Sequence, residues 1–463
     1  MGMTAAATED VVSSASAERA ELRPLALVVS VGLSVLFLVV YSGTNWLTSL
    51  RSGVGTWRYA WEDSIPFVPW MIVPYMSIDL FFVIAPFLCR SRAELQIFAS
   101  QIALAIVAAG TCFLLFPLRL AVEPPAVTGG VAVIFDWFRG LDQPYNLCPS
   151  LHIALRTILA ATYARHLLGI SRVAAHVWFS LIGFSTLLTY QHHVVDVAGG
   201  FVLAAACFYV FSAAAWRQPV VPNFRIAALY GLLLAAIGLI TFATWPCGAI
   251  LLWPTAGLVL SVTAYCGVGP AIYRKASGRI PWPSRLLMAP LLAGQYLSWL
   301  HYKRQSRAWD SVLPGLWIGR MLTDEEARGA RAAGVTAVLD LTAEVSEAAE
   351  FRSLNYFNLQ ILDLSAPTDE QIDRAIAFIG EQSRSGIVYV HCKAGYSRTA
   401  SIAGAYLLAC GQCDSAEAAM QRLRECRPSI VIRPEAIASL ERSALRLRNR
   451  RRLHGLCIPD PTF

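Results

Sequence analysis

The chain has 463 residues, of which 56% are hydrophobic and 15% charged, and its formal net charge at pH 7 is +7. Both percentages are typical of a membrane protein. The basic balance does not indicate a nucleic-acid partner, because no basic stripe with interleaved aromatic residues occurs. The 11 cysteines show no paired spacing typical of a zinc site or a disulfide framework.

Apolar stretches long enough to cross ~30 Å of hydrocarbon recur through the first part of the chain. They predict a multi-pass α-helical membrane domain of about eight spans with a six-helix core, and they lie at 24–47, 66–89, 95–117, 149–168, 173–190, 194–216, 224–244 and 246–268.

Basic residues orient these predicted spans. Loops on one side carry pairs of arginines, such as Arg90 with Arg92 and Arg165 with Arg172, whereas the last two loops on the other side carry no Lys or Arg. By the positive-inside rule, both ends of the chain are expected in the cytoplasm. A ninth apolar segment at 286–300 is short and contains Pro and Gln, which favours an interfacial helix. If it crosses instead, the C-terminal domain moves to the other side.

The composition changes after the last long apolar run, and the pattern from Ala308 onward is that of an α/β domain. "SVLPGLWIG", "TAVLDLT", "FNLQILDL" and "GIVYVHC" are expected strands. "DEQIDRAIAFIGEQ" and "SRTASIAGAYLLAC" are expected helices. The predicted organisation is an N-terminal cytoplasmic tail, a membrane domain, a basic linker with the interfacial helix, a phosphatase-like domain and a basic C-terminal tail, at 1–23, 24–270, 271–307, 308–445 and 446–463.

The stretch "YVHCKAGYSRTA" has an H-C-x5-R arrangement between the last predicted strand and a helix. Backbone N–H groups of such a loop and of the helix N-terminus point at one anion-sized space. Their field lowers the pKa of Cys392 and favours its nucleophilic thiolate. Arg398 can hold phosphate oxygens into the transition state. His391 is expected to orient the loop. The expected phosphate-binding residues are Lys393, Gly395, Ser397 and Thr399.

Residues 308–445 resemble the dual-specificity branch of the protein tyrosine phosphatases through this loop. The resemblance implies a cysteinyl-phosphate intermediate and a general acid from an upstream loop. Asp363 lies where that family places its acid, and Asp369 is the alternative. Within the branch, "HCKAG", "DLSAPTDEQ" and "RECRPSIVIRP" are most similar to the mitochondrial phosphatidylglycerophosphate phosphatases. Lys393 supplies a second cation, which favours a highly charged lipid headgroup.

Two histidine-containing stretches open predicted spans at the same side of the bilayer, "CPSLHIALR" and "STLLTYQHHVVDVAGG". Ionisable residues at such positions indicate function. His192 and Asp196 are four residues apart and share a helix face. The carboxylate can fix the imidazole tautomer, so that His192 attacks phosphorus. His152 is then available to protonate the leaving oxygen, and Ser150 to grip the phosphoryl group.

Residues 60–216 resemble the type 2 phosphatidic acid phosphatase superfamily through these stretches and "EDSIPFVPW". The resemblance is closest to its lipid-phosphotransferase branch, which includes the inositol phosphorylceramide synthases. It implies that His192 is the nucleophile and His152 the acid. The family's first motif has no clear copy, and Arg119 is its expected substitute. Thr186 stands where many members have Arg, so hydrolysis and transfer both stay open. His193 is expected to be a neighbour on the helix surface.

Together these patterns predict a bifunctional membrane enzyme acting on phospholipid headgroups, through Cys392 in the soluble domain and His192 in the membrane domain. The alternative is a membrane-anchored dual-specificity or tyrosine protein phosphatase whose membrane domain is a non-catalytic anchor. The expected partners are the membrane, phospholipids and phosphoproteins, with no nucleic acid. No cofactor and no metal is expected. The expected location is a bacterial inner membrane, with the phosphatase domain in the cytoplasm.

Overall fold

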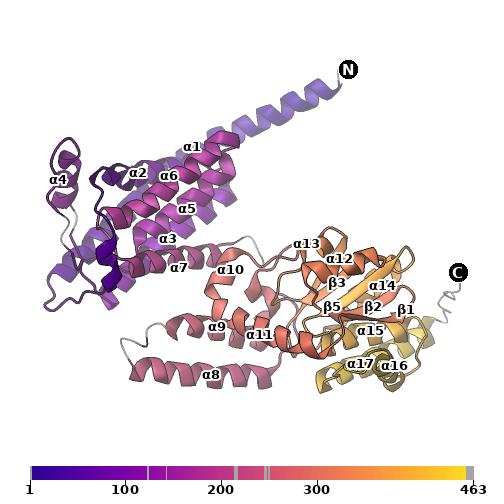
Figure 1. Ribbon diagram of the computed structural model, residues 1–463. Coiled ribbons are helices and arrows are strands. Elements are labelled where there is room, and N and C mark those ends of the chain that lie inside the picture. Colours follow the sequence, from indigo (N-terminus) through magenta and orange to yellow (C-terminus); the bar gives the residue numbers. More distant parts are fainter. Residues whose placement is uncertain are drawn as a thin grey trace. The chain divides into compact units, whose positions relative to one another are not determined.

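The computed structural model describes residues 3–122, 125–141, 143–212, 217–244, 248 and 251–454 (Figure 1). The chain folds into two compact units, Met1–Ala213 and Ala214–Phe463. The last part of the predicted C-terminal tail, 455–463, lies outside the described residues, as do 213–216 and most of 245–250 from the predicted spans.

The regular elements among the described residues of the first unit are all helices. Its helices are α1 (Met3–Ser49), α2 (Ile72–Ile84), α3 (Arg92–Leu115), α4 (Ala132–Leu141), α5 (Leu151–His166), α6 (Gly169–Leu188) and α7 (Val194–Val210), with short 3₁₀ turns at Ala60–Ser64, Pro69–Met71 and Ala85–Leu88. α5 packs against α3, α6 and α7, and α1 packs against α3. Six of these helices form a bundle, and α4 lies outside it.

Helix α1 begins at Met3, well before the predicted start of the first span at residue 24. The additional turns carry Ala and Glu, which favour helix. Helix α3 starts where the Ser91 side chain accepts a hydrogen bond from the backbone N–H of Glu94. Its Ile102, Ala105, Ile106 and Ala109 are fully buried in the core of the unit.

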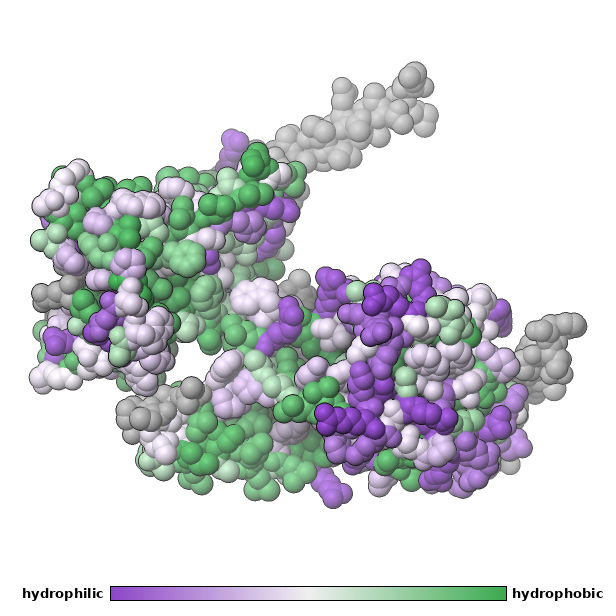
Figure 2. Space-filling model, in the orientation of Figure 1, coloured by the Kyte–Doolittle hydropathy of each residue, from purple (hydrophilic) through white to green (hydrophobic). Residues whose placement is uncertain are grey.

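Six helices of the whole described chain are long and apolar enough to cross a membrane, by length and composition. They begin at Glu21, Pro69, Arg92, Gly169, Phe224 and Leu252. α5 and α7 are shorter than the predicted spans, with 16 and 17 residues. Figure 2 shows hydrophobic residues over the helices of the first unit and over α8 and α9 of the second.

The second unit begins with a helical hairpin of α8 (Phe224–Ala243) and α9 (Leu252–Thr263). A π-helical turn (Ala264–Val268), a 3₁₀ turn (Gly269–Tyr273), α10 (Trp282–Leu287) and α11 (Ala289–Gln305) follow. These elements pack with the phosphatase domain in the second unit, whereas the prediction assigns residues up to 270 to the membrane domain. The contacts are polar: Lys275 lies fully buried beside Asp340, and the Tyr265 hydroxyl donates to the backbone carbonyl of Asp363.

The rest of the second unit is an α/β domain, as predicted. Its strands are β1 (Trp309–Leu313), β2 (Leu316–Arg320), β3 (Val335–Thr342), β4 (Asn355–Ile361) and β5 (Ile387–Cys392), in the order β1-β2-β5-β3-β4. β1 pairs antiparallel with β2, and the other pairs are parallel. The predicted strand "FNLQILDL" is shifted, because pairing with β3 starts at Asn355 and ends at Ile361.

Helices cover both faces of this sheet (Figure 1). α12 (Asp324–Ala332) and α13 (Ala349–Arg352) pack on one face around Val338 and Tyr389. The other face carries α14 (Asp369–Gln382), α15 (Ser397–Ala409), α16 (Ala416–Cys426) and α17 (Pro434–His454). β5 is therefore buried on both sides. Cys392, at its carboxyl end, lies between β2 and β3.

Candidate active site

Cys392 is the last residue of β5, and its side chain is 3% exposed. The loop after it leads directly into α15, which begins at Ser397. The first N–H groups of a helix have no acceptor within the helix, so they are available to a ligand or a thiolate. Strand, loop and helix N-terminus are thus arranged as the H-C-x5-R pattern predicted.

The local field favours the thiolate of Cys392. Burial raises the pKa of this thiol, but Arg398, the Thr399 hydroxyl and the backbone N–H groups of Thr399 and Tyr396 lower it more, so that it falls below its usual 9.0. A lowered pKa increases the share of the thiolate, which is the nucleophilic form.

Arg398 is buried, and two carboxylates hold it. Its Nη2 donates to Oε1 of Glu344 at 2.6 Å and to Oδ1 of Asp363 at 3.1 Å, and its Nη1 donates to Glu344 Oε2 at 3.1 Å. The two parallel bonds to Glu344 fix the plane of the guanidinium group. Glu344 was not predicted from the sequence. The available signal was its position directly after β3, whose carboxyl end neighbours that of β5.

Asp363 lies at the mouth of the loop between two cations. Lys393 Nζ donates to Asp363 Oδ2 at 2.6 Å and to Oε1 of Gln295, from α11, at 2.6 Å. Burial raises the pKa of Asp363, but Arg398 and Lys393 lower it to about 2. The alternative acid, Asp369, instead lies in the first turn of α14 and pairs with Arg446 at 3.2 Å. The geometry therefore places Asp363, and not Asp369, beside the cysteine loop.

Gly395 has a φ of +71°, and a Cβ atom there would lie 2.5 Å from the backbone carbonyl of Gly319. Glycine is thus required by both the conformation and the close approach to β2. Arg427 supports this backbone: it is fully buried, donates to the Gly395 carbonyl at 3.2 Å and pairs with Asp310 at 2.6 Å. Arg427 lies in "RECRPSIVIRP", one of the stretches on which the resemblance rests.

The Ser397 hydroxyl is engaged elsewhere. It donates to the carbonyl of Val431 at 2.9 Å and accepts from the backbone N–H of Arg433 at 3.1 Å. Ser397 stays a predicted phosphate-binding residue, and these two bonds leave its backbone N–H as the group for that role. Ser397 contributes the start of α15 and lines the cavity beside Cys392.

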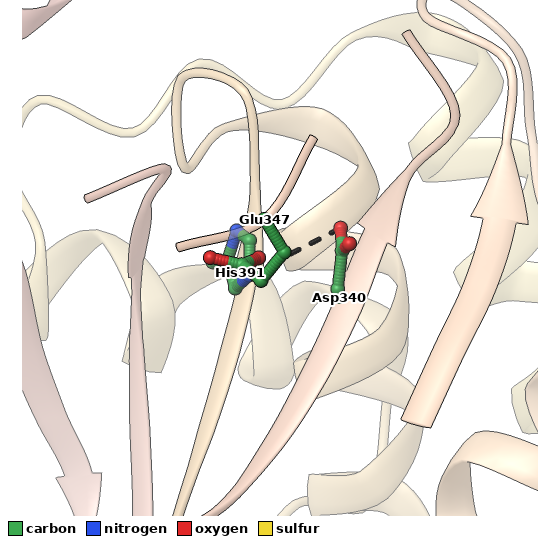
Figure 3. A group of neighbouring side chains, drawn as sticks. All are labelled: Asp340, Glu347 and His391. Carbon is green, nitrogen blue, oxygen red and sulfur yellow. Dashed lines mark ion pairs between the residues drawn. The ribbon is translucent and has the colours of Figure 1, made fainter. Parts of the chain in front are cut away.

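Behind the loop, His391 belongs to a buried polar cluster (Figure 3). Its Nε2 lies 2.7 Å from Oε2 of Glu347 and 4.0 Å from Oδ1 of Asp340. Burial lowers the pKa of His391, but Glu347 and Asp340 raise it more, so the net direction is upward. These three residues are also of the types that hold metal ions. Lys275 Nζ, 2.6 Å from Asp340 Oδ2, already supplies a positive charge to this cluster.

A cavity of about 480 Å³ opens above the cysteine loop. Its polar end contains Cys392, Lys393, Arg398 and Asp363. Away from the loop, part of the lining is Arg433, Glu435 and Ala436 at the start of α17. The rest includes apolar residues from outside the α/β domain: Leu233 and Ile237 of α8, Pro254 and Leu258 of α9, and Pro290, Leu291 and Gly294 of α11. One cavity therefore joins a cationic anion-binding loop to apolar helices.

In the first unit, the residues of the two histidine stretches lie together. Nδ1 of His192 is 3.7 Å from Oδ2 of Asp196, and both side chains are buried. The backbone N–H of Ser150 donates to the carbonyl of Asp196 at 2.9 Å. His152 stacks on Tyr75, with ring centroids 4.1 Å apart. The Ser150 hydroxyl caps α5 by accepting a hydrogen bond from the backbone N–H of Ile153. This bond competes with a bond between the hydroxyl and a phosphoryl group.

Two expectations for this unit differ from the structure. His193 is buried, not a helix-surface neighbour: its Nδ1 lies 3.3 Å from Oε2 of Glu62, and its Nε2 is 3.2 Å from the backbone N–H of Ala121. Arg119 is exposed and does not line the cavity of about 70 Å³ at His192. The arginine that lines this cavity is Arg58, which pairs with Asp63 at 2.5 Å.

Residues 316–443 match the family described as "Dual specificity phosphatase, catalytic domain". The chain is 38% identical over 103 residues to dual specificity protein phosphatase CDC14AB of Danio rerio, covering 22% of this chain and 16% of that protein. It is 35% identical over 122 residues to dual specificity protein phosphatase 12 of Mus musculus, covering 25% of this chain and 35% of that protein. The chain thus spans well under half the length of these relatives.

Among solved structures, PTPMT1 in complex with PI(5)P is similar, with a TM-score of 0.29, 21% identity, and coverage of 31% of this chain and 99% of that chain. The active form of Tk-PTP has a TM-score of 0.28 and 23% identity, with coverage of 30% of this chain and 97% of that chain. The family match falls on the strands, loop and helices that carry Cys392 and Arg398. Residues 316–443 are therefore a dual-specificity phosphatase catalytic domain.

Proposed function

We propose that this protein is a membrane-bound phosphatase that hydrolyses phosphomonoesters on phospholipid headgroups at Cys392. The observation that carries the proposal is the cavity of about 480 Å³, which has cations at its nucleophile and apolar helices along its walls. A phospholipid phosphomonoester has the same two-part character, with a charged headgroup and hydrocarbon chains.

The reaction follows from the positions of three groups. The Cys392 thiolate attacks phosphorus, an S–P bond forms and the P–O bond to the headgroup breaks. Asp363 donates its proton to the departing oxygen. Water then attacks the cysteinyl phosphate and gives a proton to Asp363, and the S–P bond breaks to release phosphate and the thiolate. Arg398 and Lys393 stabilise the negative charge that moves through both steps.

The helices α8, α9 and α11 favour a lipid over a phosphopeptide. α8 has a mean hydropathy of 2.3 and belongs to the helices long and apolar enough to cross a membrane. Its Leu233 and Ile237 line the cavity that also contains Cys392. Burying hydrocarbon against such side chains contributes about 0.8 kcal/mol per CH₂. A hydrophilic peptide gains nothing from these walls.

The test compares Gly294→Leu with Gly329→Leu in the full chain, purified in detergent–lipid micelles. Both glycines are helical with open space at the Cβ position, but only Gly294 lines the cavity. Leucine favours helix over glycine, so neither change should disturb folding. If Gly294→Leu displaces about two methylene groups, KM for phosphatidic acid or phosphatidylglycerophosphate should rise roughly tenfold. KM for p-nitrophenyl phosphate should stay unchanged, as should both values in Gly329→Leu.

Cys392→Ser should abolish phosphate release from p-nitrophenyl phosphate. It should also abolish release from the lipids when His192→Ala closes the second route proposed below. The alternative is a phosphoprotein phosphatase with a helical anchor, which the names of the relatives favour. A phosphotyrosine peptide hydrolysed far faster than either lipid, with no effect of Gly294→Leu on any substrate, would establish that alternative.

We also propose a second phosphoryl site at His192 in the first unit, of the type 2 phosphatidic acid phosphatase kind. Its support is the buried pair of His192 and Asp196, with His152 and Ser150 on the neighbouring helix α5. Nε2 of His192 would attack phosphorus, His152 would protonate the leaving oxygen, and water or an alcohol would accept the phosphoryl group. Arg58 replaces Arg119 as the proposed cation at this site.

The second site is tested in the Cys392→Ser background, where the first route is closed. Phosphate release or headgroup exchange on a lipid should persist there and disappear on His192→Ala. His176→Ala, which changes an exposed histidine on α6, is the matched control and should retain it. A Cys392→Ser protein inactive on every lipid would make the first unit a non-catalytic anchor.

A further inference from the structure

The loop that carries Asp363 is attached to helices outside the phosphatase family match. The hydroxyl of Tyr265, in the π-helical turn after α9, donates to the backbone carbonyl of Asp363 at 2.7 Å. The side-chain amide of Asn223, at the N-terminus of α8, donates to the carbonyl of Leu364 at 2.7 Å. Two consecutive carbonyls of the acid loop are thus held by the base of the α8–α9 hairpin.

The backbone at this point adopts an uncommon conformation. Leu364 has a φ of +58°, in the left-handed region that leucine rarely occupies. Such a conformation persists only when its surroundings fix it. The backbone N–H of Leu364 bonds Asp363 Oδ1 at 3.2 Å, so the turn and the carboxylate are directly linked. A change in the turn would therefore move the carboxylate.

A third contact acts on the carboxylate through Lys393. Gln295 of α11 accepts from Lys393 Nζ at 2.6 Å, and the same Nζ donates to Asp363 Oδ2 at 2.6 Å. The turn after α9 therefore holds the carbonyl of Asp363, and α11 acts on its carboxylate through Lys393. Neither segment belongs to residues 316–443.

We propose that Tyr265 and Asn223 are positioning residues, through which the α8–α9 hairpin holds Asp363 where it can protonate the leaving group. The proposal rests on the proposed function, in which Asp363 is the general acid at Cys392. General acid catalysis depends on hydrogen-bond distance to the departing oxygen, and a misplacement of about 1 Å can cost roughly 10²-fold in rate. Phosphatase activity then depends on an intact hairpin even for a soluble substrate.

The test uses two substrates of similar size that differ in their need for a proton. p-Nitrophenolate departs without protonation, whereas the more basic phenolate of phenyl phosphate needs the acid. Tyr265→Phe removes the hydroxyl and keeps the ring that stacks on Tyr230. We expect kcat for phenyl phosphate to fall roughly tenfold or more, and kcat for p-nitrophenyl phosphate to change less than about twofold.

Asn223→Ser provides a second variant. Asn223 also caps α8 by accepting from the backbone N–H of Ile226, and serine can keep that cap while losing the reach to Leu364. It should show the same dependence on the leaving group as Tyr265→Phe. Tyr406→Phe is the matched control, because its hydroxyl contacts Ser383 and it does not line the cavity. Both kcat values should stay at the wild-type level in that variant.

A double variant separates positioning from a purely structural role. If Tyr265 acts through Asp363, then Tyr265→Phe should have no further effect on phenyl phosphate in an Asp363→Asn background. Equal losses for both substrates, or an additive loss in the double variant, would overturn the proposal. Failure of the proposed function has a different result: Cys392→Ser would then hydrolyse p-nitrophenyl phosphate as fast as the wild type.

Discussion

At the scale of single residues, the proposed reaction requires Asp363 to serve as an acid although its neighbours favour its charged form. Arg398 at 3.1 Å and Lys393 at 2.6 Å hold its pKa at about 2 despite burial, so it is ionised at neutral pH without a ligand. A phosphate monoester would bring negative charge to the same two cations. Like charge nearby raises the pKa of a carboxylic acid. Binding of the substrate should therefore supply the proton that the reaction uses.

This coupling predicts how kcat depends on pH. In the complex, activity should be present while Asp363 is protonated and should fall as pH rises through the pKa of Asp363. Bound phosphate should raise that pKa above its ligand-free value of about 2. Asp363→Asn should lower kcat for a lipid substrate by roughly 10²- to 10³-fold and should remove this alkaline limb. Profiles of kcat and kcat/KM from about pH 4 to 9 provide the measurement. An alkaline limb that survives in Asp363→Asn would assign it to another group.

Sequence alone could predict the residues of the site that lie in one contiguous stretch. Cys392, Arg398 and their loop are recognisable because strand, loop and helix follow directly in the chain. Glu344 and Tyr265 were missed, since each reaches the loop from a distant segment and neither has a local pattern. His193 was misjudged for the same reason: its partner Glu62 is 131 residues away.

At the scale of elements, Lys275 joins the segment after α9 to strand β3. Its Nζ donates to Asp340 Oδ2 at 2.6 Å and to the carbonyl of Thr342 at 2.9 Å, and its side chain is fully buried. Burial raises the pKa of Asp340, but Lys275 and His391 lower it to about 2. A folded-state pKa below the unfolded value of about 3.9 means that the pair stabilises the fold above about pH 4. This contribution is lost as pH falls toward 2.

Lys275→Met should therefore destabilise the protein strongly. Removing one partner leaves a buried charge without compensation, which costs about 3–5 kcal/mol. In a unit of this size, Tm should fall by roughly 10 °C. Thermal unfolding of the full chain in detergent at pH 7 is the measurement.

The matched control for Lys275→Met is Arg331→Met, which breaks the exposed ion pair with Glu350. Such a pair contributes about 0–1 kcal/mol, so this Tm should change little. Adding Asp340→Asn to Lys275→Met should restore part of the loss. Equal Tm values for the two single variants would show that the ion pair of Lys275 with Asp340 does not stabilise the fold.

The type of most elements follows from sequence, but their partners do not. Alternation and apolar runs predicted β2, β3, β5, α14 and α15, because strand and helix periods are local properties. The hairpin of α8 and α9 was assigned to the membrane domain, since a helix facing lipid and a helix lining a protein cavity have the same apolar composition. Only long-range contacts, such as that of Asn223 with Leu364, show which unit it belongs to.

At the scale of the whole molecule, the two units carry separate candidate chemistries. Cys392 lies in the second unit and His192 in the first. The first unit has six bundle helices, and the second adds the two helices of the hairpin. If all of them cross the membrane, the number of crossings is even, and both ends of the chain lie on the same side. α11 carries Lys303 and Arg304 in its last turn, and its Trp299 donates to the Met321 carbonyl of the phosphatase domain at 3.0 Å. These facts favour α11 remaining beside the phosphatase domain.

We therefore predict that both ends of the chain lie in the cytoplasm, consistent with Arg90, Arg165 and Arg217 in loops of the same side. Alkaline phosphatase, which is active only outside the cytoplasm, should be inactive when fused after Phe463 and active when fused after Gly130, in the loop between α3 and α4. A fluorescent protein that matures only in the cytoplasm should give the opposite result at the two positions. An active alkaline phosphatase after Phe463 would mean that α11 or another helix crosses differently, and Cys392 would then face the same side as the loop at Gly130. The result in turn determines which leaflet supplies the lipid: with the predicted topology, Cys392 draws on the cytoplasmic leaflet and the proposed His192 site on the opposite one.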